Sequence, residues 1–274
     1  MKSLQDKVVV ITGAGSGIGR ALAVEVGSRG ARVAISDVND AGLAETVDLV
    51  KATGAEVRSD RLDVADRDAF VAYAAAVAEQ FGRVNVVVNN AGVTMTGDFE
   101  DMTFEEFDWI MGINVGGVIT GTKAFLPHLI ASGDGHVVNI SSLFGLVSMP
   151  GQSAYNASKY AVRGFTEALR EEMLVSGHPV GVTCVHPGGI KTGIARNGRK
   201  TAGLDATAID KLFEERLARM SPEKAARIIV RGILKDQARV LVGIDAHVVH
   251  QFGKLAGSRY QDVVAVVSKR VLPS

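Results

Sequence analysis

The sequence predicts an α/β fold, in which a doubly wound parallel sheet of about seven strands carries helices on both faces. Two observations support this prediction. Short, nearly continuous apolar segments such as 8–11, 84–88 and 180–185 are typical of strands that are buried on both faces. Segments of helical composition separate them, and strand and helix alternate about seven times.

Length and composition favour one domain, residues 1–274. With 47% hydrophobic residues the chain can bury a full core. Lys plus Arg equals Asp plus Glu at 30 each, so no net charge favours nucleic acid as a partner. The single Cys184 excludes an intrachain disulfide and fits a reducing compartment. Because neither a signal peptide nor an apolar run of about 20 residues is evident, we expect a soluble, cytoplasmic protein.

A glycine-rich segment follows the first predicted strand. It reads Thr12-Gly13-Ala14-Gly15-Ser16-Gly17-Ile18-Gly19, and a helical segment begins near residue 21. Glycines at 13, 17 and 19 let the backbone turn tightly and approach a pyrophosphate, which free amides at a helix N-terminus stabilise. The spacing differs from G-x-G-x-x-G. The flanking strand and helix nevertheless favour dinucleotide binding over a simple turn.

The second predicted strand, residues 32–36, ends in Asp37. A carboxylate there can accept hydrogen bonds from both ribose hydroxyls and would repel a 2′-phosphate, so we expect NAD in preference to NADP. Arg20 and Arg32 remain as basic residues that could accept such a phosphate. In isolation, Asp37 could instead cap the helix predicted at residues 41–53.

Tyr155 and Lys159 lie four residues apart in a segment of helical composition, so both side chains leave one helix face. Lowering the pKa of a phenol by ~3 units requires about 4 kcal/mol. An ammonium about 4 Å away supplies about that much at an effective dielectric constant of about 20. Ser142, after the strand predicted at 136–140, could hydrogen-bond the same substrate oxygen. On its own, a Tyr and Lys pair at this spacing usually lies on a helix surface.

Together these motifs resemble the short-chain dehydrogenase/reductase family. The resemblance covers residues 6 to about 192 and extends more loosely to about 243. It implies a Rossmann fold, a nicotinamide cofactor and hydride transfer between that cofactor and a secondary alcohol or ketone. The matching motifs are the glycine segment 12–19, Asp63-Val64, Asn89-Asn90-Ala91-Gly92, Asn114, Ser142, Tyr155-x-x-x-Lys159 and Pro187-Gly188.

The resemblance implies a role for each site residue. Tyr155 would transfer the proton, Lys159 would lower its pKa and hold the nicotinamide ribose, and Ser142 would orient the substrate oxygen. Asn114 would bind a water that links Lys159 to solvent, although a buried amide usually serves structure. No metal site is expected. The residues implied in cofactor binding are Gly13, Ser16, Gly17, Ile18, Gly19, Asp37, Asp63, Val64, Asn90, Tyr155, Lys159, Ile190 and Thr192.

Two polar residues near these motifs have plain structural alternatives. Asp63, which the resemblance places beside the adenine, could equally cap the following helix. His186 stands where family members more often carry Asn, and we expect it to be a local structural variant, because Tyr155 already supplies the proton.

Three further regions bear on the substrate and on partners. Residues of about 190–220 are expected to form a lid over a largely apolar pocket. The tail, about 244–274, carries apolar residues at helical spacing; packing on its own core or on a neighbouring subunit is a plainer expectation than membrane contact. By resemblance, the long helices 104–131 and 153–176 form the interface of a homodimer or homotetramer. The expected pocket walls also include Leu143, Phe144, Leu146, Val147 and Met149.

Two functions compete with an NAD-linked dehydrogenase acting on a small, largely apolar molecule. An NADP-dependent carbonyl reductase would use the same catalytic residues. A non-catalytic nucleotide-binding regulator would keep the fold and lose the chemistry. The full set of four catalytic residue types argues against the regulator, because such a protein has no physical need for all of them.

Overall fold

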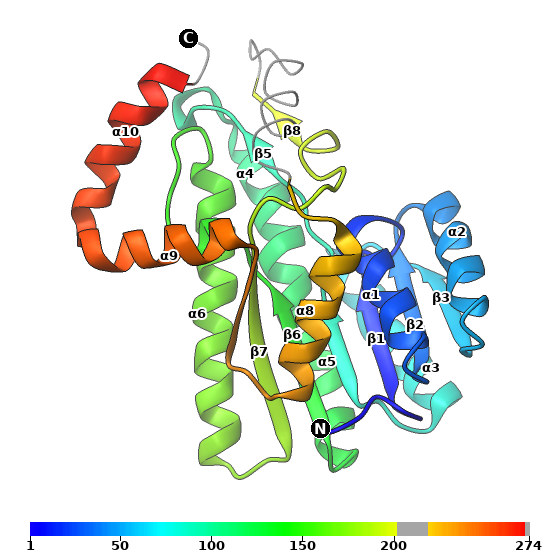
Figure 1. The fold of residues 1–274 in the computed structure, drawn as a ribbon. Coiled ribbons are helices and arrows are strands. Elements are labelled where there is room, and N and C mark those ends of the chain that lie inside the picture. The colour runs from blue at the N-terminus through cyan, green and yellow to red at the C-terminus, as the bar shows by residue number, and fades with distance from the viewer. Residues whose placement is uncertain (202–218, 272–274) are drawn as a thin grey trace.

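The computed structural model describes residues 1–201 and 219–271, and a seven-stranded parallel sheet lies at its centre (Figure 1). The strands are β1 (Val8–Thr12), β2 (Arg32–Asp37), β3 (Val57–Arg61), β4 (Val86–Asn89), β6 (Gly135–Ile140), β7 (Val180–Pro187) and β9 (Arg239–Val242). Their order is β3-β2-β1-β4-β6-β7-β9. The chain therefore winds outward in both directions from β1 and β4, which confirms the doubly wound α/β fold.

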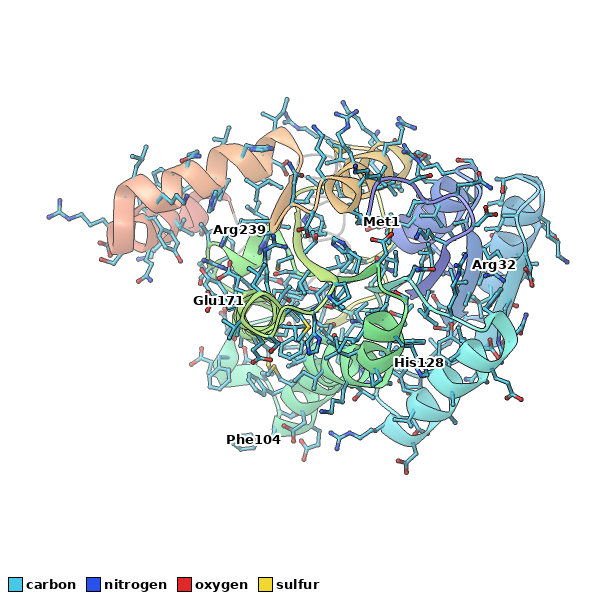
Figure 2. The ribbon with its side chains drawn as sticks, turned by 90° about the horizontal axis from the view of Figure 1, so that it is seen from below. Met1, Arg32, Phe104, His128, Glu171 and Arg239 are labelled. Atoms are coloured by element: carbon cyan, nitrogen blue, oxygen red, sulfur yellow. The ribbon has the colours of Figure 1, made fainter. Side chains whose placement is uncertain are left out.

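Helices cover both faces of this sheet (Figures 1 and 2). They are α1 (Gly17–Gly27), α2 (Asp40–Lys51), α3 (Arg67–Phe81), α4 (Phe104–Met111), α5 (Gly117–Ala131), α6 (Ser153–Val175), α8 (Pro222–Leu234), α9 (Ile244–Ala256) and α10 (Tyr260–Val271). On one face, α1, α2 and α8 pack with Val9 and Ile11 of β1. On the other, α3, α5 and α6 pack with Val8 and Val10. Because side chains of β1 alternate between the two cores, the strand is apolar from Val8 to Ile11, and only Thr12 at its carboxyl end is polar.

The helix predicted over 104–131 is interrupted. Between α4 and α5 lies a π-helical segment, Gly112–Gly116. Such segments are rare and occur often at functional sites. Glycine permits this geometry and also lets α5 approach closely, since a Cβ at Gly117 would lie 2.8 Å from Val64. The sequence indicated the glycines but not the change in helix type.

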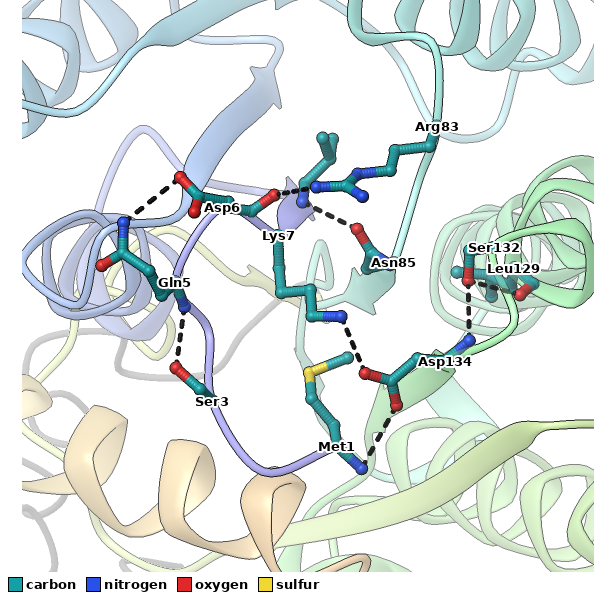
Figure 3. A network of polar contacts seen from close by, with 11 residues as sticks. Met1, Ser3, Gln5, Asp6, Lys7, Arg83, Asn85, Leu129, Ser132 and Asp134 are labelled. Carbon is teal, nitrogen blue, oxygen red and sulfur yellow. Dashed lines mark hydrogen bonds and ion pairs between the residues drawn. The ribbon is translucent and has the colours of Figure 1, made fainter.

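The N-terminal segment is tied to the turn that precedes β6 (Figure 3). Lys7 Nζ donates to Asp134 Oδ2 at 2.8 Å, and the α-amino group of Met1 lies 3.3 Å from the other carboxylate oxygen. Burial acts to raise the pKa of Asp134, but the hydrogen bond from Lys7 and the α-amino charge hold it below its ordinary value. Asp134 therefore contributes stability in its ionised form.

Replacing Asp134 with Asn should lower the free energy of unfolding by less than about 1 kcal/mol at pH 7, because the pair is partly exposed. The carboxyl pKa is depressed on folding, so this contribution is present above the unfolded-state pKa of about 3.9 and is lost as pH falls through the lower folded value. Urea unfolding of both proteins at pH 7 and pH 3 measures it. Equal differences at both pH values would contradict the assignment, and Lys7→Gln should give a loss that is not additive with Asp134→Asn.

Within the C-terminal extension expected at about 244–274, the described residues 244–271 form α9 and α10, which project from the body of the molecule (Figures 1 and 2). Ala246 and His250 of α9 are buried, so α9 does pack on its own chain. Several aliphatic side chains of both helices nevertheless face solvent, Leu255 at 88% exposure and Val266 at 54%. In the residues that the structure describes, no helix has the length and apolar character needed to cross a membrane.

Candidate active site

The glycine loop at the carboxyl end of β1 forms a cradle for a phosphate group. Gly13 and Gly17 have φ of +65° and +53°, values that favour glycine. Ser16 is the N-cap of α1 but makes no side-chain cap bond, and the first turn holds no acidic residue. The N-termini of α2, α3, α4 and α8, in contrast, are closed by capping side chains. The first amides of α1, including those of Ile18 and Gly19, thus lack a side-chain cap and fit a pyrophosphate.

Asn90 holds this loop in place. Its side-chain amide donates to the carbonyl oxygens of Thr12 at 2.9 Å and Gly13 at 3.0 Å, and its backbone N–H bonds the Thr12 hydroxyl. A Cβ at Gly19 would overlap the Gly13 carbonyl oxygen, so only glycine lets α1 start here. Asn90 therefore shapes the cradle from β4, the strand next to β1 at the switch point.

Asp37, at the end of β2, has its carboxylate fixed toward the glycine loop. Oδ2 accepts the Gly15 N–H at 2.8 Å, and Oδ1 accepts the Asn39 N–H at 3.0 Å. Each oxygen keeps a second lone pair for a ribose hydroxyl. Asn39, rather than Asp37, caps α2, so the capping alternative for Asp37 is wrong.

The two arginines that could have accepted a 2′-phosphate are both engaged elsewhere. Arg20 bonds the carbonyl oxygens of Gly15 and Gly42 and forms an ion pair with Glu45 at 2.8 Å. Arg32 lies at the opposite end of β2, with its guanidinium 5.5 Å from the Phe81 ring centroid. Arg32 therefore lies away from the end of β2, whereas Arg20 lies beside the glycine loop with its guanidinium occupied by these carbonyl oxygens and by Glu45.

The other residues expected around the cofactor surround the same edge. Asp63 is exposed and its Oδ1 accepts the Ala65 N–H at 2.9 Å, while Asp66 caps α3. Val64 is buried against α5. The methyl group of Thr192 would lie 3.1 Å from a Cβ at Gly17, so Thr192 stands directly over the glycine loop. Ile190 is only 3% exposed.

Ser142 and Tyr155 meet where β6 ends and α6 begins. Ser142 Oγ accepts the Phe144 N–H at 3.1 Å, and its hydroxyl lies close enough to that of Tyr155 to lower the pKa of the phenol. The Phe144 ring packs edge-on against the Tyr155 ring with centroids 6.1 Å apart. The phenol is thus held by contacts on its ring and at its oxygen.

Lys159 lies one turn further along α6 and is only 3% exposed. Its Nζ donates to the Ile140 carbonyl oxygen at 3.1 Å and lies 5.6 Å from the centroid of the Tyr155 ring. Burial lowers the pKa of Lys159 to about 8. The ammonium is therefore desolvated beside the phenol, as the four-residue spacing predicted.

The pKa of Tyr155 differs from the sequence-based expectation. Burial raises it above the ordinary value of a phenol, and the nearby Ser142 hydroxyl lowers it only in part. Lys159 does not produce the expected depression in this structure, in which its ammonium donates to the Ile140 carbonyl oxygen and lies 5.6 Å from the centroid of the phenol ring. At neutral pH the phenol of the unliganded chain keeps its proton.

Asn114 lies in the π-helical segment and is fully buried. Its Oδ1 accepts the Val93 N–H at 2.8 Å, and its Nδ2 donates to the Val93 carbonyl at 2.9 Å and to Ser158 Oγ at 3.0 Å. A Cβ at Gly92 would lie 3.1 Å from Asn114 Oδ1 and 3.3 Å from Lys159 Nζ, so both polar atoms face Gly92. The side chain serves structure and also borders the site.

His186 supports Ser142 from β7. Its Nδ1 lies 2.8 Å from the Ser142 carbonyl oxygen, which can only accept, so Nδ1 carries the proton. Burial lowers the pKa of His186 to about 4, so the ring is neutral near pH 7. A neutral, buried ring agrees with the expectation that His186 is structural. The hydrogen bond to the Ser142 carbonyl oxygen was not predicted.

The sequence analysis missed Asn156, which organises the segment between β6 and α6. We call this segment, residues 141–152, the serine loop. Asn156 Nδ2 donates to the carbonyls of Phe144 at 2.7 Å and Val147 at 3.0 Å, and its Oδ1 accepts the Met149 N–H at 3.1 Å. A polar residue directly after Tyr155 in a helix otherwise rich in alanine was the available signal.

Other features of the described residues lie away from this edge. A surface hollow of about 570 Å³, bordered by Gln5, Arg29 and Glu56, lies at the amino end of β2, opposite the catalytic side chains. Burial raises the pKa of Cys184 to about 12, so this thiol is inert. In residues 1–201 and 219–271, no three His, Cys, Asp or Glu side chains gather as a metal site would require.

Known proteins match this chain over most of its length. The family model for short chain dehydrogenases matches residues 7–203. A Mycobacterium tuberculosis protein named "Putative oxidoreductase SadH" is 56% identical over 100% of this chain and 99% of its own. Estradiol 17-beta-dehydrogenase 11 of Homo sapiens is 32% identical over 88% of this chain and 76% of its own. The crystal structure of a short chain dehydrogenase/reductase from Burkholderia phymatum in complex with NAD superposes with a TM-score of 0.87, at 31% identity and with 93% and 95% of the two chains covered. The chain belongs to the short-chain dehydrogenase/reductase family of oxidoreductases.

Proposed function

We propose that this oxidoreductase transfers hydride between NAD and a secondary alcohol or ketone on an apolar skeleton. The observation that carries the proposal is the meeting of Ser142, Tyr155 and Lys159 beside an uncapped glycine loop at one sheet edge. Parallel sheets bind ligands at this edge, where the strand order reverses. The groups for dinucleotide binding and the groups for proton transfer therefore lie within one site.

The uncapped helix start and the orphaned first amides fit NAD, which when bound supplies the hydride acceptor or donor. The Ser142 hydroxyl would hold the substrate oxygen. In reduction Tyr155 Oη would donate its proton to that oxygen; in oxidation the phenol would first release its proton to solvent, and the phenolate would then take the proton of the alcohol. Lys159 would stabilise the phenolate in that step and hold the nicotinamide ribose. Asn114 would anchor a water between Lys159 and solvent, since Asn114 Oδ1 and Lys159 Nζ both border Gly92.

NAD is the preferred cofactor in this proposal. The Asp37 carboxylate stands at the end of β2, fixed by the Gly15 N–H, and it would repel a 2′-phosphate. Arg20 already binds the Gly15 carbonyl oxygen, and Arg32 lies against the Phe81 ring, so neither arginine is expected to offset that repulsion. An NADP-dependent carbonyl reductase is therefore the weaker alternative.

The substrate class rests on the serine loop and on a relative. Leu143, Phe144 and Leu146 are half-buried next to the catalytic hydroxyls and can offer apolar contact. Val147, expected in the pocket wall, is covered by α9 and is only 3% exposed. Within the lid expected at about 190–220, residues 202–218 lie outside the described residues. The name of estradiol 17-beta-dehydrogenase 11 states action on a steroid alcohol, which fits an apolar skeleton.

We further propose that the chain is a cytoplasmic homodimer or homotetramer. The proposed interface is formed by α4, α5 and α6, as the family resemblance implies. Phe104, at 84% exposure, points outward from the start of α4 (Figure 2), and Leu174 and Val175 at the end of α6 are also exposed. Burial of such side chains against a second copy would remove apolar surface from water.

The function is tested by following reduction of NAD and of NADP at the nicotinamide absorbance with a panel of aliphatic and steroid-like secondary alcohols. We expect turnover with NAD and at least one apolar alcohol, and much slower turnover with NADP. If the protein binds NAD but neither oxidises any alcohol nor reduces any of the matching ketones, a regulator would be favoured. Failure to bind either cofactor would contradict the assignment of the glycine loop.

A further inference from the structure

The C-terminal extension reaches the active site at two points. Asp245, at the start of α9, accepts the Gly189 N–H at 2.6 Å, in the turn that follows β7 and leads to Ile190 and Thr192. Further along α9, a Cβ at Gly253 would lie only 2.9 Å from Val147 of the serine loop. Figure 1 shows the green serine loop beside α9. The extension thus touches both the cofactor side and the substrate side of the site.

Tyr260, the first residue of α10, makes the most specific of these contacts. Its hydroxyl oxygen accepts the backbone N–H of Ser148 at 3.0 Å, and the residue is only 9% exposed. Tyr160 of α6 lies beside the same hydroxyl, and each of the two phenols shifts the pKa of the other. One phenol therefore joins the serine loop, α6 and the C-terminal extension.

The pKa directions agree with Tyr260 acting as the acceptor in this cluster. Burial raises the pKa of Tyr160, and the neighbouring Tyr260 hydroxyl raises it further. Burial acts in the same direction on Tyr260, but Ser148 and the Tyr160 hydroxyl hold the pKa of Tyr260 below its ordinary value. A group that accepts several hydrogen bonds is stabilised as the anion, and the group that donates is not.

The serine loop has several other anchors, among them His186 Nδ1 on the Ser142 carbonyl, Gln152 Nε2 on Thr96 Oγ1 and the Gly97 N–H on the Gly151 carbonyl. Asn156 holds Phe144, Val147 and Met149, and Ser141 Oγ donates to the Lys159 carbonyl at 2.8 Å. Asn156 Nδ2 holds the Val147 carbonyl oxygen, and Tyr260 Oη accepts the Ser148 N–H of the same peptide group. The carbonyl and the N–H of a trans peptide point in opposite directions, so Tyr260 holds this peptide on the side that Asn156 leaves unbound.

We propose that Tyr260 is a positioning residue that fixes the serine loop as the outer wall of the substrate pocket and thereby sets the affinity for bulky apolar substrates. This proposal rests on the proposed function for its substrate. It assigns the C-terminal extension a role within its own subunit: the extension braces the segment that joins Ser142 to Tyr155. Tyr260 acts through the loop and does not touch the reacting atoms.

The test compares Tyr260→Phe with Tyr73→Phe in the full chain. Tyr73→Phe makes the same chemical change in the packing between α3 and α5, where its ring contacts Phe125. Loss of one hydrogen bond should raise hydrogen exchange in the peptide that contains Ser148 by about three- to tenfold, with the sheet unchanged. For the bulkiest alcohol oxidised, KM should rise about three- to tenfold, while kcat and the KM for NAD change less than about twofold. Tyr73→Phe should leave all these values unchanged.

Each outcome decides the proposal. Unchanged exchange at Ser148, or equal increases in the loop and the sheet, would show that Tyr260 does not position the loop. Faster exchange with an unchanged KM would show that the loop is anchored but is not the pocket wall. If the unmodified chain oxidises no alcohol, the proposed function fails, whereas the exchange measurement needs no substrate and still decides the anchoring role.

Discussion

Tyr155→Phe should lose nearly all turnover and still bind NAD. General acid–base groups contribute about 10²- to 10⁴-fold to rate, so we expect kcat to fall by about 10³-fold or more. The phenylalanine ring keeps the edge-on contact with Phe144, so the fold should persist. The contacts that shape the dinucleotide cradle come from Asn90, Asp37 and the glycine loop, and none of them uses the phenol oxygen. NAD affinity should therefore change no more than severalfold.

Steady-state kinetics and NAD binding by calorimetry check this result in the same preparation. Tyr73→Phe is the control, because it also removes a phenol oxygen but from the core beside Phe125. Turnover at the normal rate by Tyr155→Phe would contradict the mechanism. Loss of NAD binding together with turnover would instead point to a structural role for the phenol.

Much of the fold and the placement of the site followed from the sequence, because the signals were local. The apolar segment 8–11 had to be a strand with two buried faces, and parallel strands bring their carboxyl ends to one edge. That edge gathers the glycine loop, Asp37 and Ser142 in the structure. The four-residue spacing of Tyr155 and Lys159 placed both on one helix face, and both are buried there.

What the sequence could not supply depends on contacts between distant segments. The direction of the Tyr155 pKa shift is set by burial and by where Lys159 Nζ points, and spacing along a helix determines neither. The bond between Tyr260 and Ser148 spans 112 residues and has no motif. The π-helical segment at Gly112–Gly116 likewise depends on the bonds that draw Asn114 to Val93.

Asp37→Ala should reverse or abolish the preference for NAD over NADP. A carboxylate and a phosphate charge about 4 Å apart repel by about 1 kcal/mol in water and about 4 kcal/mol at an effective dielectric constant of about 20. Removing the carboxylate should therefore improve NADP affinity by about ten- to a thousandfold relative to NAD. Loss of the charged acceptor for the ribose hydroxyls, worth about 1.5–3 kcal/mol, should also weaken NAD itself by about tenfold or more.

Besides repelling a 2′-phosphate, Asp37 holds the glycine loop, because its Oδ2 accepts the Gly15 N–H at 2.8 Å. The experiment must separate these two roles. Alanine removes both the charge and this anchor of the glycine loop, which would weaken either cofactor. Asp37→Asn keeps an acceptor oxygen for Gly15 and removes only the charge, so it should gain NADP affinity with a smaller loss of NAD affinity than Asp37→Ala. Dissociation constants for both cofactors with both variants distinguish the effects. If Asp37→Ala loses affinity for NAD and NADP equally and Asp37→Asn loses none, Asp37 serves only the structure of the glycine loop. If the ratio of the two affinities is unchanged in both variants, Asp37 has no role in the preference for NAD.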